Sequence, residues 1–157
     1  MEKAFSSPYV LTERLGHVPD AAELAGMAED ELVAVFSTPP ALHRFPGSMA
    51  KRVQAMCQLV VEQYDGDVSR VWTQAADGRD LLKRLSGLPG FGKQKAQIFL
   101  ALLGKQYGVD VPGWREAAGE FGPADTYRSV ADIRDAESLG KVREYKKQLK
   151  AAAKAKD

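Results

Sequence analysis

The stretch from Leu85 to Gly104 constrains the fold most, because it places a glycine-containing turn between two apolar helical patterns. Gly90 and Gly92 lack a Cβ atom, so the turn can adopt positive φ angles and let another molecule approach its backbone closely. After the turn, apolar residues recur at the three-to-four spacing of one helix face, at Ala96, Phe99, Leu100 and Leu103. The stretch therefore predicts a helix, a hairpin turn and a second helix.

The start of the second helix is suited to an anion such as a phosphate group. The first backbone N–H groups of a helix have no intrahelical acceptor and lie at the positive end of the helix dipole. Lys93, Gln94 and Lys95 occupy this first turn. The alternative is that the glycines only allow the turn between two helices to close, which is the commoner role of a Gly-x-Gly sequence.

A family resemblance favours the phosphate interpretation. Leu88, Pro89, Gly90, Gly92 and Ala96 match the hairpin of helix-hairpin-helix DNA-binding proteins. The wider stretch 28–109 resembles the HhH-GPD superfamily of base-excision DNA glycosylases, which includes endonuclease III, and within it a group of small uncharacterised bacterial proteins. The helix expected over 47–66, with its basic start and its closing Tyr-x-Gly, belongs to this resemblance.

The resemblance implies a compact all-α HhH-GPD domain over residues 1–137 with one helix-hairpin-helix motif. The apolar spacing and basic residues of 138–157 predict a basic C-terminal helix after it. The resemblance also implies that the first helix of the family, and the Gln-rich turn that probes the opened base pair, are missing before Met1. We therefore expect DNA binding of base-excision-repair ancestry.

In proteins of this kind, amides of the hairpin hold a DNA phosphate, and hairpin carbonyls often bind a monovalent cation. The expected partner is double-stranded DNA, bound by its phosphate backbone, with K⁺ or Na⁺ as a cofactor of the hairpin. Lys51 and Arg52, at the start of a helix where a cation gains nothing from the dipole, are either further DNA contacts or ordinary exposed residues. The hairpin contacts that the resemblance implies are Leu88, Gly90, Phe91, Gly92, Lys93, Gln94 and Lys95.

The catalytic positions of the family match less well. Gln94 stands where the bifunctional glycosylases have a catalytic lysine, and a glutamine amide cannot form a Schiff base. Asp110 is the candidate for the catalytic aspartate, but it comes earlier than the family spacing and Pro112 follows it closely. It is either a carboxylate that stabilises an oxocarbenium-like sugar or an ordinary loop residue. The chain is accordingly either a monofunctional glycosylase acting on a flipped damaged base or a non-catalytic DNA-binding or protein-interaction module.

The composition of the chain limits which cofactors it could bind and where in the cell we expect it. The single cysteine, Cys57, cannot form an internal disulfide or the four-cysteine iron-sulfur cluster of many endonuclease III relatives, and its apolar surroundings predict a buried structural thiol. Two isolated histidines suggest no metal site. We expect a cytoplasmic protein, because no apolar run approaches the ~20 residues needed to cross a membrane and no signal peptide is recognisable. The resemblance implies a bacterial cytosol. The sequence specifies no oligomeric state.

The formal net charge of +1 means that nucleic-acid binding must depend on local patches. Seven basic residues lie between Lys141 and Lys156, either as a solvated helix face or as a supplementary phosphate-binding surface. Trp114 beside Arg115 either stacks on an extruded base or packs in the core.

Local patterns predict where several helices begin. Asp20, three residues before Glu23, has capping-box spacing, and Ser48 and Asp80 are the expected N-caps of two further helices. The helix after Ser48 has an apolar stripe at Met49, Val53, Met56, Val60 and Tyr64. A final helix is expected from Ser138, with one apolar side formed by Leu139, Val142, Tyr145 and Leu149.

Overall fold

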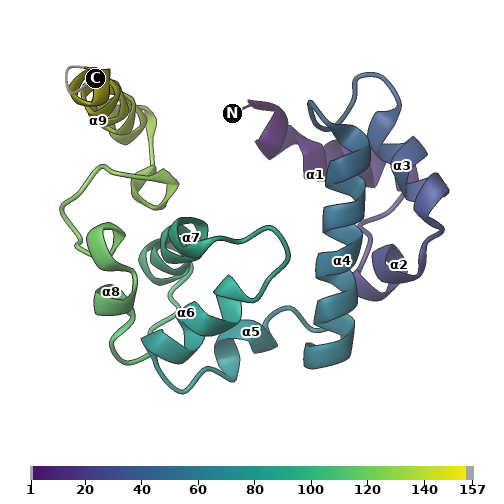
Figure 1. Cartoon of the computed structure of the whole chain (residues 1–157), viewed down its shortest axis with the longest axis horizontal. Helices are drawn as coiled ribbons and strands as arrows, with labels where there is room; N and C mark the ends of the chain where they lie inside the picture. The colour runs from purple at the N-terminus through teal and green to yellow at the C-terminus, as the bar shows by residue number, and fades with distance from the viewer. Residues whose placement is uncertain (1, 155–157) are drawn as a thin grey trace. The chain divides into compact units, whose positions relative to one another are not determined.

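The computed structural model describes residues 2–154, and Figure 1 shows helices joined by loops throughout this part of the chain. No β-strand occurs within it, so the prediction of an all-α fold is confirmed. None of its helices has the length and apolar character that a membrane span requires. In chain order, the elements are α1 (Glu2–Leu15), α2 (Ala21–Gly26), α3 (Glu29–Ser37), α4 (Pro46–Tyr64), α5 (Arg70–Thr73), α6 (Gly78–Ser86), α7 (Lys93–Gln106), α8 (Trp114–Ala117), the 3₁₀ helices η1 (Gly119–Phe121) and η2 (Val130–Asp132), and α9 (Ala136–Lys154).

The chain divides into two compact units. The first contains the residues up to Arg70 together with Leu88–Gly90, and the second contains Val71–Gly87 and the chain from Phe91 onward. The division into residues 1–137 and 138–157 stays a prediction.

The first unit is built on α4, against which α2 and α3 pack (Figure 1). Asp20 caps α2 as predicted, because its carboxylate accepts a hydrogen bond of 2.8 Å from the backbone N–H of Glu23. The Glu23 carboxylate lies 2.7 Å from His17 Nε2. The core of the unit consists of Leu24, Leu32, Phe36, Leu42, Ala50 and Cys57, with Val10, Leu11 and Leu15 of α1 packed against it.

Two predictions about α4 are corrected. The helix begins at Pro46 rather than after Ser48, because proline has the φ angle that a first helical residue needs and its missing N–H costs nothing there. Its buried side is also rotated by one residue from the predicted stripe. Met49, Val53 and Met56 are only half-buried, whereas Ala50, Gln54 and Cys57 are buried in their place. Val60 and Tyr64, nearer the end of the helix, are buried as predicted.

Gln54 explains part of this rotation. Its side-chain amide donates a 2.6 Å hydrogen bond to the carbonyl oxygen of Met27, so a polar residue is satisfied inside the core. Three residues further on, Cys57 is buried, as predicted for a structural thiol. Burial raises the pKa of this thiol, because an apolar environment disfavours the thiolate.

The second unit packs α6 and α8 against α7. Trp114 is 5% exposed, which decides in favour of core packing over base stacking. Gly104 of α7 makes room for it, since a Cβ atom at Gly104 would stand 2.6 Å from the indole ring. The guanidinium of Arg115 lies over the same indole, 4.3 Å from its centroid. The other large buried side chains of this unit are Val71, Leu81, Leu85, Leu100, Leu103, Phe121 and Val142.

The N-cap of α6 is Asp77, not Asp80. The carboxylate of Asp77 accepts hydrogen bonds of 2.9 and 2.8 Å from the backbone N–H groups of Arg79 and Asp80. Asp80 instead accepts from the N–H of Ala76 and from Nε of Arg84, at 3.1 and 3.0 Å. The cap residue therefore lies one turn earlier than the sequence pattern indicated.

A buried ion pair fixes η2 to the end of α7. Lys105 Nζ lies 2.6 Å from Asp132 Oδ1, and the two side chains are only 4% and 2% exposed. The other carboxylate oxygen of Asp132 accepts from the backbone N–H groups of Arg128 and Ser129. The neighbouring Gln106 amide donates to three carbonyl oxygens around η2, those of Val130, Ala131 and Ile133.

The last helix, α9, begins two residues before the predicted start. Ser138 stands inside it, and its Oγ accepts hydrogen bonds of 2.9 Å from the N–H groups of Arg134 and Asp135. Val142 is buried as predicted, but Leu149 is 51% exposed, so the prediction that it packs is wrong. Every side chain from 146 to 153 is exposed, because this part of the helix extends past the residues that α9 packs against.

Candidate nucleic-acid interface

The hairpin turn lies between the end of α6 at Ser86 and the start of α7 at Lys93. Gly90 has φ +85°, a conformation that favours glycine, so the expectation of a positive φ angle is confirmed there. Gly92, the N-cap of α7, has φ −89° and ψ 169°, an extended conformation open to any residue. A Cβ atom at Gly92 would meet nothing within 4 Å. The fold therefore requires glycine at position 90 but leaves open space at position 92.

Two apolar side chains of the turn point into the protein. Leu88 is 7% exposed, and Phe91 is half-buried with its ring edge-on to that of Phe99, at a centroid distance of 5.7 Å. Of the predicted DNA contacts, these two residues can offer a ligand mainly their backbone groups.

Arg52 lies against the turn within the first unit. A Cβ atom at Gly90 would stand 2.4 Å from Arg52 Cδ and 3.2 Å from its Nε. Gly90 is thus favoured by its φ angle, and a larger residue there would also displace the flexible side chain of Arg52. A cation beside the hairpin backbone agrees with the interpretation of Arg52 as a phosphate contact.

Lys51 has a different environment. Its Nζ forms a 2.6 Å ion pair with Glu29 of α3, and the two side chains are 60% and 61% exposed. An exposed pair of this kind contributes little to stability, yet the carboxylate offsets the charge that a phosphate would meet. Lys51 is therefore a weaker candidate contact than Arg52.

The first turn of α7 exposes Lys93, Gln94 and Lys95. No side chain caps this helix at Gly92. A helix start of this kind presents backbone N–H groups and the positive end of the dipole to an anion, and the two lysines add charge.

The residues of the hairpin turn limit which groups could bind K⁺ or Na⁺ there. Between Leu88 and Gly92 no side chain carries an oxygen atom, so backbone carbonyls are the donors available to K⁺ or Na⁺. Among the residues described, no group of three or more His, Cys, Asp or Glu side chains is arranged to hold a metal ion.

Asp110 follows α7 and is exposed. Its Oδ1 accepts a 3.3 Å hydrogen bond from the indole Nε1 of Trp114. A nearby concavity of about 460 Å³ at the starts of α6 and α8 does not include Asp110 in its lining, which is formed by Asp77, Arg79, Pro112, Gly113, Glu116 and Ala117. A carboxylate that stabilises an oxocarbenium ion works in a dry pocket, and Asp110 has no such environment.

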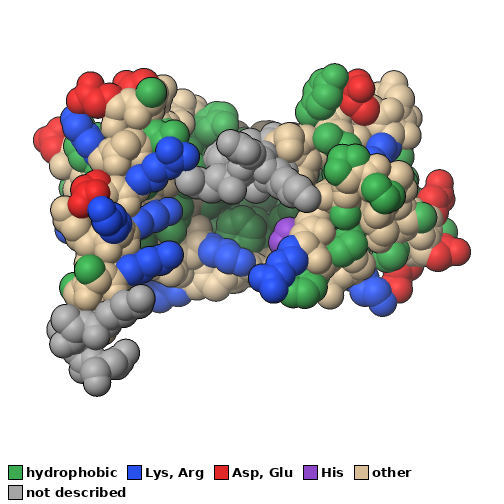
Figure 2. All heavy atoms as spheres, turned by 90° about the horizontal axis from the view of Figure 1, so that it is seen from above, with side chains coloured by type: hydrophobic (Ala, Val, Ile, Leu, Met, Phe, Trp, Pro, Cys, Tyr) green, Lys and Arg blue, Asp and Glu red, His purple; other side chains and the backbone are tan. Residues whose placement is uncertain are grey.

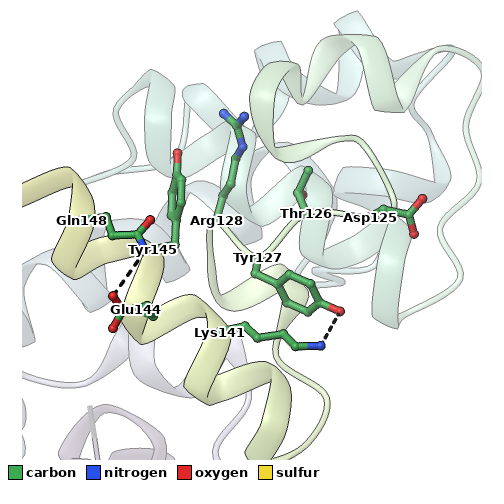
Figure 3. Close-up of a pocket in the computed structure, with 8 residues that line it drawn as sticks. All are labelled: Asp125, Thr126, Tyr127, Arg128, Lys141, Glu144, Tyr145 and Gln148. Atoms are coloured by element: carbon green, nitrogen blue, oxygen red, sulfur yellow. Dashed lines mark hydrogen bonds between the residues drawn. The ribbon is translucent and has the colours of Figure 1, made fainter. Parts of the chain in front are cut away.

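A second concavity, of about 420 Å³, lies between the 125–128 segment and α9 (Figure 3). Cations cover both of its tyrosines, with Lys141 Nζ 4.7 Å from the ring centroid of Tyr127 and the guanidinium carbon of Arg128 5.6 Å from that of Tyr145. Lys141 and Arg128 already pair with Glu137 and Glu120, at 2.7 and 2.6 Å, and Asp125 and Glu144 also line the groove, so it has no excess positive charge for a phosphate. The groove has no signal in the sequence, because it depends on how the 125–128 segment folds onto α9.

Comparisons of the chain with protein-family models, with curated proteins and with solved structures find no match.

Proposed function

We propose that the chain binds double-stranded DNA through the hairpin and the first turn of α7, without sequence preference. The observation that carries this proposal is the start of α7, where no side chain caps the helix and Lys93 and Lys95 are exposed beside its first backbone N–H groups.

The expected contacts are to the DNA backbone. A phosphate accepts hydrogen bonds from N–H groups at the start of α7, and the side chains of Lys93 and Lys95 add charge. The hairpin carbonyls hold K⁺ or Na⁺, which supplies further positive charge next to the phosphate. No contact of this set reads a base edge, so affinity is independent of sequence and falls with rising salt.

We further propose that this is a non-catalytic module of base-excision-repair ancestry. Gln94 cannot supply a lyase amine, and Asp110 is exposed and bonded to Trp114. A monofunctional glycosylase would need a carboxylate close to the sugar, shielded from water. Protein interaction in place of DNA binding is the remaining alternative for a module of this kind.

Replacement of Gly92 by valine tests the proposal directly. Position 92 has extended backbone angles and open space, so Gly92→Val keeps the fold, but its branched side chain blocks a phosphate from the first amides of α7. Gly26→Val is the matched control, because a Cβ atom at Gly26 also meets nothing within 4 Å and Gly26 lies at the end of α2.

The measurement is a titration of a fluorescent duplex at low salt, with circular dichroism to monitor folding. We expect Gly92→Val to reduce the affinity at least tenfold, and Gly26→Val to bind like the wild type. Equal affinity of all three proteins would refute backbone binding at the hairpin. Absence of duplex binding by the wild type would leave protein interaction as the function.

A further inference from the structure

The exposed half of α9 carries four basic residues, Arg143, Lys146, Lys147 and Lys150, in a pattern that repeats every three to four positions. At about 100° per residue, these positions fall within roughly a quarter to a third of the helix circumference. All four side chains are exposed. They therefore form a single basic stripe, which we name the α9 stripe. Lys156, part of the same basic run, lies outside the described residues.

The charges of the α9 stripe are not neutralised within the described part of the chain. Glu137 pairs with Lys141 at 2.7 Å, and Glu144, which accepts a 3.3 Å hydrogen bond from the neutral Gln148, offsets at most one of the four positive charges. Among residues 6–153, whose side chains the structure describes, no ion pair includes a residue of the stripe. Figure 2 shows Lys and Arg side chains gathered over α9.

We propose that the α9 stripe is a second binding surface for the phosphate backbone of DNA. The inference rests on the proposed function in one respect, that the same duplex is the partner. The stripe is about 10 Å long, since seven residues separate its ends and each adds about 1.5 Å. This length suits several successive phosphates, and binding there releases counterions from the DNA.

The neighbouring residues favour nucleic acid over a membrane. A helix that lies on a membrane needs a broad face of bulky apolar residues. Beyond Tyr145, the described part of α9 offers Leu149 and three alanines, Ala151, Ala152 and Ala153.

A protein partner is also less well matched. The centre of a protein–protein interface is enriched in aromatic residues and depleted of lysine, and the stripe has three lysines and no aromatic residue. Charge complementarity to a polyanion therefore identifies the partner.

The test neutralises the stripe in the full chain. In one variant Arg143, Lys146, Lys147 and Lys150 all become Gln, and in a smaller variant only Lys146 and Lys150 do. The matched control is Arg70→Gln/Arg128→Gln, which removes two charges that already pair with acids and lie outside α9. Glutamine is a good helix former, so α9 stays helical in every variant.

Affinity for a duplex is measured against salt concentration, and Gly92→Val is measured in parallel. In the variant with four substitutions, we expect the slope of log affinity against log salt to fall by about two to four units. In the variant with two substitutions, it should fall by about one to two units. The control pair should leave the slope unchanged.

The outcomes separate this inference from the proposed function. If the variant with four substitutions keeps the wild-type slope while Gly92→Val no longer binds, the stripe is not a DNA-binding surface. DNA binding at the hairpin is then supported. If the variant with four substitutions has a lower slope while Gly92→Val binds normally, DNA binding by the stripe is supported. DNA binding at the hairpin is then contradicted. Binding to vesicles of 30% phosphatidylserine in preference to the duplex, or binding to neither, would also overturn the inference.

Discussion

The Arg52 side chain lies so close to Gly90 that a Cβ atom on the glycine would stand 2.4 Å from Arg52 Cδ. This contact joins the beginning of α4 to the hairpin turn within the first unit. Gly90 also has φ +85°, and this backbone conformation is what favours glycine at the position, since the Arg52 side chain is flexible enough to move.

The first prediction concerns the stability of the turn. Gly90→Ala should lower the free energy of unfolding by about 1–2 kcal/mol, because a residue with a Cβ atom is strained at positive φ. Displacement of Arg52 adds to this cost. Gly92→Ala should cost less than about 1 kcal/mol, since alanine tolerates an extended backbone and restricts the unfolded chain but is a poorer N-cap than glycine. Urea unfolding of both variants provides the comparison, and equal destabilisation by the two would contradict the geometry of the turn.

The second prediction concerns the buried pair of Lys105 and Asp132. Asp132→Ala should lower the free energy of unfolding by about 3–5 kcal/mol, because it leaves a buried ammonium without its partner. The matched control is Glu137→Gln, which removes the acid of the exposed pair with Lys141 and should cost less than about 1 kcal/mol. Thermal or urea unfolding measures both, and a small effect of Asp132→Ala would show that the pair is not closed in solution.

The third prediction concerns the thiol of Cys57. Its pKa is raised by burial, so at any given pH it has a smaller thiolate fraction than an exposed cysteine. A thiol reagent such as DTNB should therefore react slowly with the folded protein at pH 8 and rapidly in denaturing urea. Reaction of the folded protein at the rate of a free thiol would be inconsistent with a buried Cys57.

The fourth prediction concerns catalysis. The wild-type chain should release little or no base from duplexes that contain alkylated, oxidised or deaminated bases, because Asp110 is exposed and bonded to Trp114. Asp110→Asn should fold normally and behave in the same way. Robust base release that disappears in Asp110→Asn, with an unchanged circular dichroism spectrum, would show instead that the chain is an active glycosylase.

The features that depend on neighbouring residues could be predicted from the sequence. Asp20 caps α2 through a bond to Glu23, three residues away, and Gly90 has the predicted positive φ angle. Ser48 and Asp80 were wrong as caps because other residues close by compete for the same role. Pro46 begins α4 earlier, and Asp77 accepts two backbone N–H groups at the start of α6.

The remaining features depend on contacts between distant parts of the chain, for which the sequence has no local signal. The burial of Trp114 requires Gly104, the buried side of α4 depends on the bond from Gln54 to Met27, and Arg52 meets Gly90 across 38 positions of the sequence. The stripe of α9 is different, because its spacing is visible in the sequence. Its exposure follows only from the point at which α9 leaves the core, which made Leu149 a wrong prediction.

The salt dependence of duplex binding tests the central claim, DNA binding at the hairpin, most directly. The variant Lys93→Gln/Lys95→Gln is compared with Arg70→Gln/Arg128→Gln, which has the same net charge, on two duplexes of unrelated sequence. We predict that the lysine variant binds both duplexes more weakly, with a slope of log affinity against log salt lower by about one unit for each phosphate that it no longer neutralises. The control should keep the wild-type slope. An unchanged slope in the lysine variant, or weaker binding confined to one duplex, would contradict the account.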